Sequence, residues 1–135
     1  MTIYWGDGTS TSTNPSGGAA ESSGTWSPSY YNANNVSIST NAAQYIAVGD
    51  LVHFNIRFYF GFTYDSDHIR FTLPYTNGGD EVIVIAIKQG AGGDLMGKIP
   101  SGDSWCQIRG HNNDDHLTYS AHDGYTYVCS GTYQK

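Results

Sequence analysis

The stretch that decides the fold is residues 49–75, which read GDLVHFNIRFYFGFTYDSDHIRFTLPY. From residue 51 to residue 60, apolar side chains alternate with mostly polar ones, and the apolar set is Val52, Phe54, Ile56, Phe58 and Phe60. Successive side chains of a strand point to opposite faces, so this alternation predicts a β-strand with one wholly apolar face. Its β-branched and aromatic residues also favour the pleated surface of a sheet.

The second half of the same stretch predicts a second strand. Residues 68–73 alternate again, with Ile69, Phe71 and Leu73 on one face. Pro74 ends this strand, because proline has no backbone N–H to donate to a neighbouring strand. We expect the two strands to pair with each other across the polar turn that joins them.

Length and composition favour one all-β domain. A chain of 135 residues has room for one compact unit, which at this size buries roughly two-thirds of the surface of its unfolded chain. Seventeen glycines, eleven tyrosines and only 13% charged residues suit short strands joined by polar turns. The predicted fold is an antiparallel β-sandwich of the jelly-roll type.

Charge and hydropathy exclude several classes of partner. A formal net charge of −6, with only six Lys and Arg residues, argues against sequence-independent nucleic-acid binding and against anionic membranes. No apolar run approaches the roughly 20 residues that span a bilayer. The N-terminus lacks a basic region followed by an apolar one, so we expect a soluble protein made without a signal peptide.

Residues 1–23 differ in composition from the rest of the chain. After the apolar cluster Ile3, Tyr4 and Trp5 comes a stretch rich in Gly, Ser and Thr, with too little apolar surface to offset the entropy of ordering it. Two interpretations stand side by side: an extended segment that docks onto a neighbouring subunit or another protein, and a simple flexible tail. The compact β-domain is expected over residues 24–135.

Short apolar segments recur along this domain at the spacing typical of a β-sandwich. Residues 81–88, EVIVIAIK, are apolar on both faces, which predicts a strand covered on both sides, in a sheet interior or at a subunit interface. Residues 89–97 are expected to form a glycine-rich loop. Further strands are predicted at residues 24–31, 105–109 and 125–133, and a short hairpin at residues 36–40 and 44–48.

Four segments of the chain together resemble a known family. They are GTWSP at residues 24–28, QYIAVGDLV at residues 44–52, LPY at residues 73–75 and SGTY at residues 130–133. Their order and spacing resemble C-terminal receptor-binding domains of bacteriophage tail fibres and tailspikes, in which a GTWTP-like opening precedes a GDLV strand entry and an LPF or LPY strand exit. Many relatives have a lysine before the glycine of GDLV, whereas this chain has Ala47 and Val48.

The resemblance implies a β-sandwich that assembles as a homotrimer on a virion and contacts a host-surface glycan or protein. Residues 1–23 would attach it to other phage tail or virion proteins through Ile3, Tyr4 and Trp5, and the protein would be made in the host cytoplasm. The shared motifs are framework positions, so no catalytic residue carries over, and no cofactor or membrane insertion is implied. Two alternatives stay open: a virion decoration or baseplate protein that binds only phage proteins, and a monomeric carbohydrate-binding module.

Three pairs of neighbouring carboxylates invite comparison with glycosidases, which hold two acids about 5 to 10 Å apart. All three pairs lie in or beside predicted turns, where aspartate hydrogen-bonds the local backbone. A small sandwich also offers little of the long cleft that endo-acting enzymes need, so we predict no enzymatic activity. The pairs are Asp65 with Asp67, Asp80 with Glu81, and Asp114 with Asp115.

The densest group of potential metal ligands comprises His111, Asp114, Asp115, His116, His122 and Asp123. Histidines five residues apart on a loop have no fixed geometry, so a solvated loop is favoured over a zinc, nickel or calcium site. The only cysteines, Cys106 and Cys129, are expected in strands as a buried thiol pair, with a disulfide as the alternative.

The aromatic residues suggest how a receptor would be bound. Eleven Tyr and three Trp on a weakly charged chain suit sugar recognition, in which rings stack on a pyranose while amide or carboxylate groups hydrogen-bond its hydroxyls. The same rings would equally fill a core or a trimer interface. The candidate ligand-binding residues are Trp105, His111, Asn112, Asn113, Asp114, Tyr119 and Tyr125.

Overall fold

The computed structural model describes residues 3–4, 10–11, 21–31, 38–61, 68–89, 95–110 and 124–135. β1 (Ile3–Tyr4) and β2 (Ser10–Thr11) pair in a two-stranded sheet of their own. The other strands form one antiparallel sheet in the order β3-β4-β5-β10-β7-β8-β9-β6. They are β3 (Glu21–Thr25), β4 (Ile38–Val48), β5 (Leu51–Phe60), β6 (Arg70–Thr72), β7 (Val82–Gln89), β8 (Leu95–Ile99), β9 (Trp105–Gly110) and β10 (Tyr125–Gln134).

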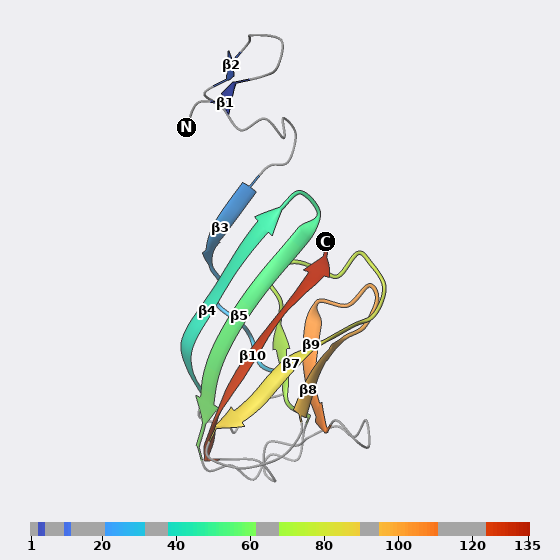
Figure 1. Ribbon diagram of the computed structural model, residues 1–135. Coiled ribbons are helices and arrows are strands. Elements are labelled where there is room, and N and C mark those ends of the chain that lie inside the picture. Colours follow the sequence, from blue (N-terminus) through green and yellow to red (C-terminus); the bar gives the residue numbers. More distant parts are fainter. Residues whose placement is uncertain are drawn as a thin grey trace.

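The eight-stranded sheet curls into a half-barrel, in which the long strands β4, β5, β10 and β7 lie side by side (Figure 1). The prediction of an antiparallel all-β fold is confirmed. The strands predicted at residues 81–88, 105–109 and 125–133 are confirmed as β7, β9 and β10. The sheet is continuous from β3 to β6, and its concave face encloses the core.

β5 shows the predicted alternation along its whole length. Every second side chain is fully buried and the side chains between them are exposed. Phe58 and Phe60 stack on Tyr127 of β10, with ring centroids 5.6 and 5.1 Å apart. Each large apolar side chain that is fully buried stabilises the fold by about 1.5–3 kcal/mol, so β5 is the centre of the core.

The predicted pairing of the two strands in residues 49–75 is wrong. β5 pairs with β4 on one side and with β10 on the other, whereas β6 pairs with β9. The two strands instead face each other across the core, where the Phe71 ring centroid lies 6.2 Å from that of Phe54 and 5.8 Å from that of Phe58. Alternation shows that each strand has one buried face, but it does not identify the neighbouring strand.

One strand replaces the hairpin predicted at residues 36–48. β4 runs without a turn and pairs with β5 along its length. Its register shifts between Thr40 and Ala42, so the polar residue Asn41 forms a β-bulge. A bulge accommodates an extra residue without ending a strand, which explains why this polar run resembles a turn in sequence. The turn predicted at Gly49 and Asp50 is confirmed.

β8 occupies part of the segment that was predicted to be a glycine-rich loop. Gly97 and Ile99 are buried and Leu95 packs against the core, so the strand has an inward face. A Cβ atom on Gly97 would lie 2.9 Å from the sulfur of Cys106 and 3.0 Å from that of Cys129. This glycine therefore marks a close approach inside a strand, which a sequence cannot distinguish from a loop.

Cys106 and Cys129 are buried free thiols, as expected, with their sulfurs 3.9 Å apart. Their strands, β9 and β10, are separated in the sheet by β7 and β8, so the sulfurs meet only because the sheet curls over Gly97. Burial raises the pKa of the Cys106 thiol well above its usual value. The reactive thiolate is therefore disfavoured at this position.

Residues 26–31 connect the two edge strands of the sheet, from β3 toward β6. The backbone N–H of Trp26 donates to the carbonyl oxygen of Ala43 in β4, at 3.2 Å. Four residues further on, Tyr30 forms an antiparallel bridge with Phe71 of β6. The predicted edge strand at residues 24–31 is thus divided between two partners: its first part pairs with β4, and its second part bridges to β6 at the opposite edge of the sheet.

The main sheet begins at Glu21 rather than at residue 24, because β3 pairs with β4 from Glu21 onward. Of the predicted attachment residues, Ile3 and Tyr4 form β1. Trp5 lies outside the described residues.

Candidate binding surfaces

The structure does not bring together the two predicted ligand-binding residues that it describes. Trp105 begins β9 and Tyr125 begins β10. The strands β10, β7, β8 and β9 are neighbours in that order, and each is antiparallel to the next. β9 therefore runs opposite to β10, and the first residues of these two strands lie at opposite ends of the strands. The other predicted ligand-binding residues lie outside the described ranges: His111, Asn112, Asn113, Asp114 and Tyr119.

Trp105 and Tyr125 each have a packing role. The Trp105 ring lies edge-on to Tyr31 at 5.7 Å, and the guanidinium of Arg70 lies 4.6 Å from the Tyr31 ring centroid. The ammonium of Lys88 lies 4.7 Å from the ring centroid of Tyr125, which also packs against the core. Such a cation–π contact is worth about 0.5–1 kcal/mol at an exposed site. Both rings are therefore anchored to the sheet.

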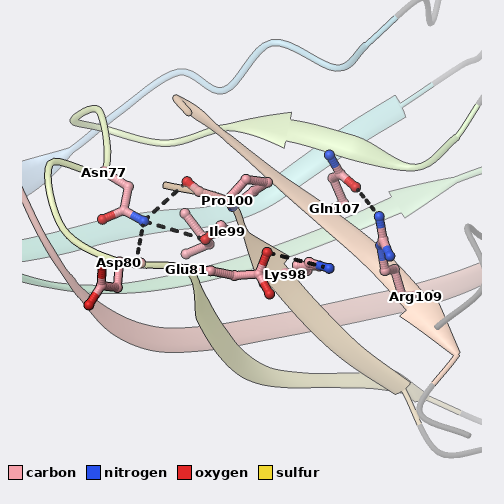
Figure 2. A network of polar contacts seen from close by, with 8 residues as sticks. All are labelled: Asn77, Asp80, Glu81, Lys98, Ile99, Pro100, Gln107 and Arg109. Atoms are coloured by element: carbon pink, nitrogen blue, oxygen red, sulfur yellow. Dashed lines mark hydrogen bonds and ion pairs between the residues drawn. The ribbon is translucent and has the colours of Figure 1, made fainter. Parts of the chain in front are cut away.

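The carboxylate pair Asp80 and Glu81 belongs to a structural turn before β7. Asn77, fully buried beside it, donates from Nδ2 to three backbone carbonyls, including that of Asp80 at 2.9 Å (Figure 2). The Glu81 carboxylate lies 3.4 Å from Nζ of Lys98. These contacts hold the turn in place. The other two carboxylate pairs lie outside the described residues: Asp65 with Asp67, and Asp114 with Asp115.

In the described ranges, no three His, Cys, Asp or Glu side chains gather into a metal-binding group. The candidate metal ligands between residues 111 and 123 lie outside those ranges. The described residues also contain no helix long and apolar enough to cross a membrane.

β7 exposes a row of isoleucines on the convex face of the sheet. Ile83, Ile85 and Ile87 are 54%, 69% and 53% exposed, whereas Val84 and Ala86 between them are buried in the core. β7 lies between β10 and β8, so its backbone is paired on both sides. The strand was predicted to be covered on both faces, and within one chain only the concave face is covered. We call this row the isoleucine stripe.

The surface around the isoleucine stripe carries no carboxylate on the described residues of β5, β10 and β7. The strand register places Met96 of β8 opposite Ile85, and Val128 of β10 opposite Ile87. The acidic residues that the structure describes lie at strand ends or in turns: Glu21, Asp50, Asp80, Glu81 and Asp103.

A groove follows the edge strand β3 and its neighbour β4. It consists of two open hollows, of about 400 and 440 Å³, that share Thr25 and Gln44 in their lining. The first hollow extends across the convex face to Asn55 of β5. The second surrounds the bulge of β4 and is lined by Asn41 and Trp26. We call these two hollows the β3–β4 groove.

Trp26 is held firmly in the second hollow. Its Nε1 donates to the carbonyl oxygen of Thr72 at 2.8 Å, and its ring lies edge-on to Phe54 with centroids 6.4 Å apart. The ring nevertheless remains partly exposed. The groove therefore contains an indole whose orientation is set before any ligand arrives.

The four segments that carry the family resemblance meet in one network of contacts. Gly24 pairs with Tyr45 across β3 and β4, and the Tyr45 ring lies edge-on to Tyr75 at 5.6 Å. The hydroxyl of Tyr133 donates to the carbonyl oxygen of Tyr75 at 2.8 Å and accepts from its N–H at 3.1 Å. These residues act as framework, which is the role that the resemblance implies for them.

Two buried tyrosine hydroxyls reinforce this framework. Burial raises the pKa of Tyr133 to about 12, and it raises the pKa of Tyr30 to about 12 as well. The Tyr30 hydroxyl lies 2.7 Å from that of Thr40, next to the bulge of β4. Both phenols therefore stay protonated well above neutral pH and remain available as hydrogen-bond donors.

The β3–β4 groove was not predicted from the sequence. Part of its lining comes from three strands that only the register brings side by side: Thr25 lies opposite Gln44, and Gln44 lies opposite Asn55. The only signals in the sequence were the aromatic residue of GTWSP and the polar residues that alternate with buried ones in residues 44–55.

Comparison with known proteins adds no assignment: no protein-family model matches the chain, and neither a curated protein nor a solved structure matches it.

Proposed function

We propose that this protein is a non-enzymatic receptor-binding subunit of a bacteriophage tail fibre, which assembles as a homotrimer and attaches the virion to a host-surface glycan or protein. The observation that carries the proposal is the isoleucine stripe. Three neighbouring isoleucines that are each more than half exposed form an apolar patch with a polar rim. Such a patch marks an interaction surface, because leaving it in contact with water is unfavourable.

The surroundings of the stripe support contact between copies of the same chain. A stable interface buries about 800 Å² on each partner, which is more than three isoleucines supply. We therefore expect Met96 and Val128 to extend the apolar centre, and the hydroxyl side chains of β10 to form its rim. In a trimer the contact would be heterologous, with the stripe of one copy meeting a different surface of the next.

The remaining parts of the chain fit the same proposal. Contacts of Phe71 with Phe54 and Phe58 across the core support a sandwich-like arrangement in which β6 faces β5. The short sheet of β1 and β2, with Ile3 and Tyr4, would attach the domain to other phage tail or virion proteins.

Light scattering coupled to gel filtration tests the assembly. We expect a mass near three times 14.7 kDa. A mass near 14.7 kDa would overturn the homotrimer. A trimer that binds phage structural proteins, but no material from host envelopes, would favour a virion decoration or baseplate protein instead.

The β3–β4 groove favours a second candidate function, a monomeric carbohydrate-binding module. A firmly held, partly exposed Trp26 beside amide side chains suits a module that binds sugars without assembling. Solution mass separates the two functions, since a monomer with affinity for glycans would support the module.

A further inference from the structure

We propose that the β3–β4 groove binds an uncharged oligosaccharide, with Trp26 as a stacking platform and Gln44 and Asn41 as hydrogen-bonding side chains. This inference gives a ligand class to the receptor contact proposed above and rests on that function. It places the contact on β3 and β4, whereas the sequence suggested residues between Trp105 and Tyr125.

The shape of the groove suits a chain rather than a single small molecule. The two hollows, of about 400 and 440 Å³, adjoin because Thr25 and Gln44 line both of them. Each hollow has the volume of a site for a small ligand, since such sites range from about 300 to 1,000 Å³. Linked sugar units would place successive rings in the two hollows.

The aromatic residue of the groove is preorganised. The hydrogen bond from Trp26 Nε1 to Thr72 and the edge-on contact with Phe54 fix the plane of the indole. A ring that is already ordered loses little conformational entropy on binding. The apolar face of a pyranose can therefore stack on it at low cost.

The polar residues of the groove match sugar hydroxyls. Gln44 lies where the hollows meet, and Asn41 lies at the bulge in the second hollow. A carboxamide offers two donor hydrogens and one acceptor oxygen, which suits neighbouring hydroxyl groups that both donate and accept. A bulge also re-aims its side chain relative to a regular strand, which gives Asn41 a distinct direction.

The absence of charge selects the class of sugar. The described lining contains no Asp, Glu, Lys or Arg side chain. Sulfated, phosphorylated or carboxylated saccharides would be desolvated there without a cationic partner. A protein segment that adds a strand to β3 would use backbone groups at the edge of the sheet rather than these side chains.

A panel of neutral and acidic oligosaccharides on an array, followed by calorimetry with the best neutral binder, tests the inference. We expect Gln44→Ala and Asn41→Ala each to weaken binding at least tenfold. Gln89→Ala removes an exposed amide of the same kind from the end of β7, outside the groove, and should bind as the parent protein does. Unchanged thermal unfolding of all three variants confirms that they fold.

The outcomes separate this inference from the proposed function. Neutral glycans that bind Gln44→Ala and Asn41→Ala as well as the parent protein would overturn the groove as the site. A trimer that binds only acidic glycans, only peptides or no glycan would overturn the inference and leave the receptor-binding subunit standing. A monomer whose neutral-glycan binding depends on Gln44 and Asn41 would support the inference and overturn the homotrimer.

Discussion

β5 and β7 are both interior strands of the same sheet, yet their convex faces differ. β5 buries every second side chain against the core, and β7 buries Val84 and Ala86 there. The exposed residues at the centre of β5 are polar, and Leu51 and Tyr59 are exposed toward its ends, whereas the exposed residues at the centre of β7 are isoleucines, with Gln89 exposed at its end. The centre of the convex face is therefore polar on β5 and apolar on β7. In the trimer proposed above, β7 is the strand on which a second copy of the chain would pack.

The concave and convex faces of the sheet relate to different properties of the protein. Residues on the concave face report how the chain folds, because their contacts lie within one copy. Residues on the convex face contribute little to that fold, so a conspicuous side chain there points to an interaction. The following predictions test this division, beginning with the concave face.

The largest loss of stability is expected from Gly131→Ala in β10. A Cβ atom on Gly131 would lie 2.1 Å from Cγ1 of Val84 and 2.5 Å from its Cβ, on the neighbouring strand β7. Such overpacking destabilises a core by about 1–3 kcal/mol, and we expect the upper end of that range. Urea denaturation measures the change in the free energy of unfolding.

The double variant Gly131→Ala with Val84→Gly is the matched control, because glycine removes both the Cγ1 and the Cβ atom that the new methyl group would meet. It should recover part of the lost stability. A single variant as stable as the parent protein would show that β7 and β10 do not pack as closely as the structure indicates.

A smaller loss is expected from Tyr133→Phe, which removes one hydroxyl from the concave face. That hydroxyl donates to the carbonyl oxygen of Tyr75 and accepts from its N–H, so both backbone groups lose a partner. The expected cost is about 1–2 kcal/mol. Thermal and urea unfolding measure it, and a variant of unchanged stability would remove this contact from the framework.

Tyr133 and Tyr30 also predict how stability depends on pH. In the unfolded chain these phenols ionise near pH 10.0, and in the folded chain near pH 12. Between those values the folded chain keeps protons that the unfolded chain has lost. Their contribution is therefore complete below about pH 10 and is lost as the pH rises through 12.

Unfolding monitored by circular dichroism from pH 8 to pH 12 tests this dependence. Tyr133→Phe and Tyr30→Phe should each make the alkaline loss of stability shallower. A loss that is as steep in both variants as in the parent protein would assign it to other groups.

The smallest effect on folding, and the clearest effect on assembly, is expected from Ile85→Asp. Ile85 is 69% exposed, so its replacement should change the free energy of unfolding of the monomer by about 1 kcal/mol or less. The carboxylate would nevertheless lie in the centre of the apolar patch. We expect a folded monomer by light scattering.

Asn55→Asp places the same charge on the convex face of β5 and should leave the trimer intact. If Ile85→Asp remains a folded trimer, the isoleucine stripe is not the interface. If Asn55→Asp also dissociates the trimer, the contrast between β5 and β7 fails.

Much of the fold followed from local pattern. The alternation in residues 51–60 predicted β5 with the correct face buried, and similar patterns predicted β7, β9 and β10. The errors lie where the pattern is interrupted. A bulge at Asn41 resembles a turn, and Gly97 makes β8 resemble a loop, because both features are defined by neighbouring strands rather than by the segment itself.

The candidate sites divide in the same way. The apolar character of both faces of β7 was evident in residues 81–88 and predicted a strand covered on both sides, in a sheet interior or at a subunit interface, whereas the single chain leaves three of its isoleucines exposed. The β3–β4 groove was not predicted, because Thr25, Gln44 and Asn55 become neighbours only through the pairing of three strands, and Trp26 reaches β4 through the carbonyl oxygen of Ala43. The predicted aromatic site does not bring Trp105 and Tyr125 together. Their closeness in sequence did not show that β9 and β10 run in opposite directions, which places their first residues at opposite ends of the strands.

By itself, the sequence determined that this chain forms antiparallel β-structure, which residues of its longest strand are buried, and that one strand is too apolar to face water on either side. Those properties depend on side-chain periodicity and polarity, which are local. Only the tertiary structure decided the order of strands, the face left bare on β7 and the groove beside Trp26. These depend on register and curl, which arise from contacts between residues far apart in the chain and leave no periodic trace in it.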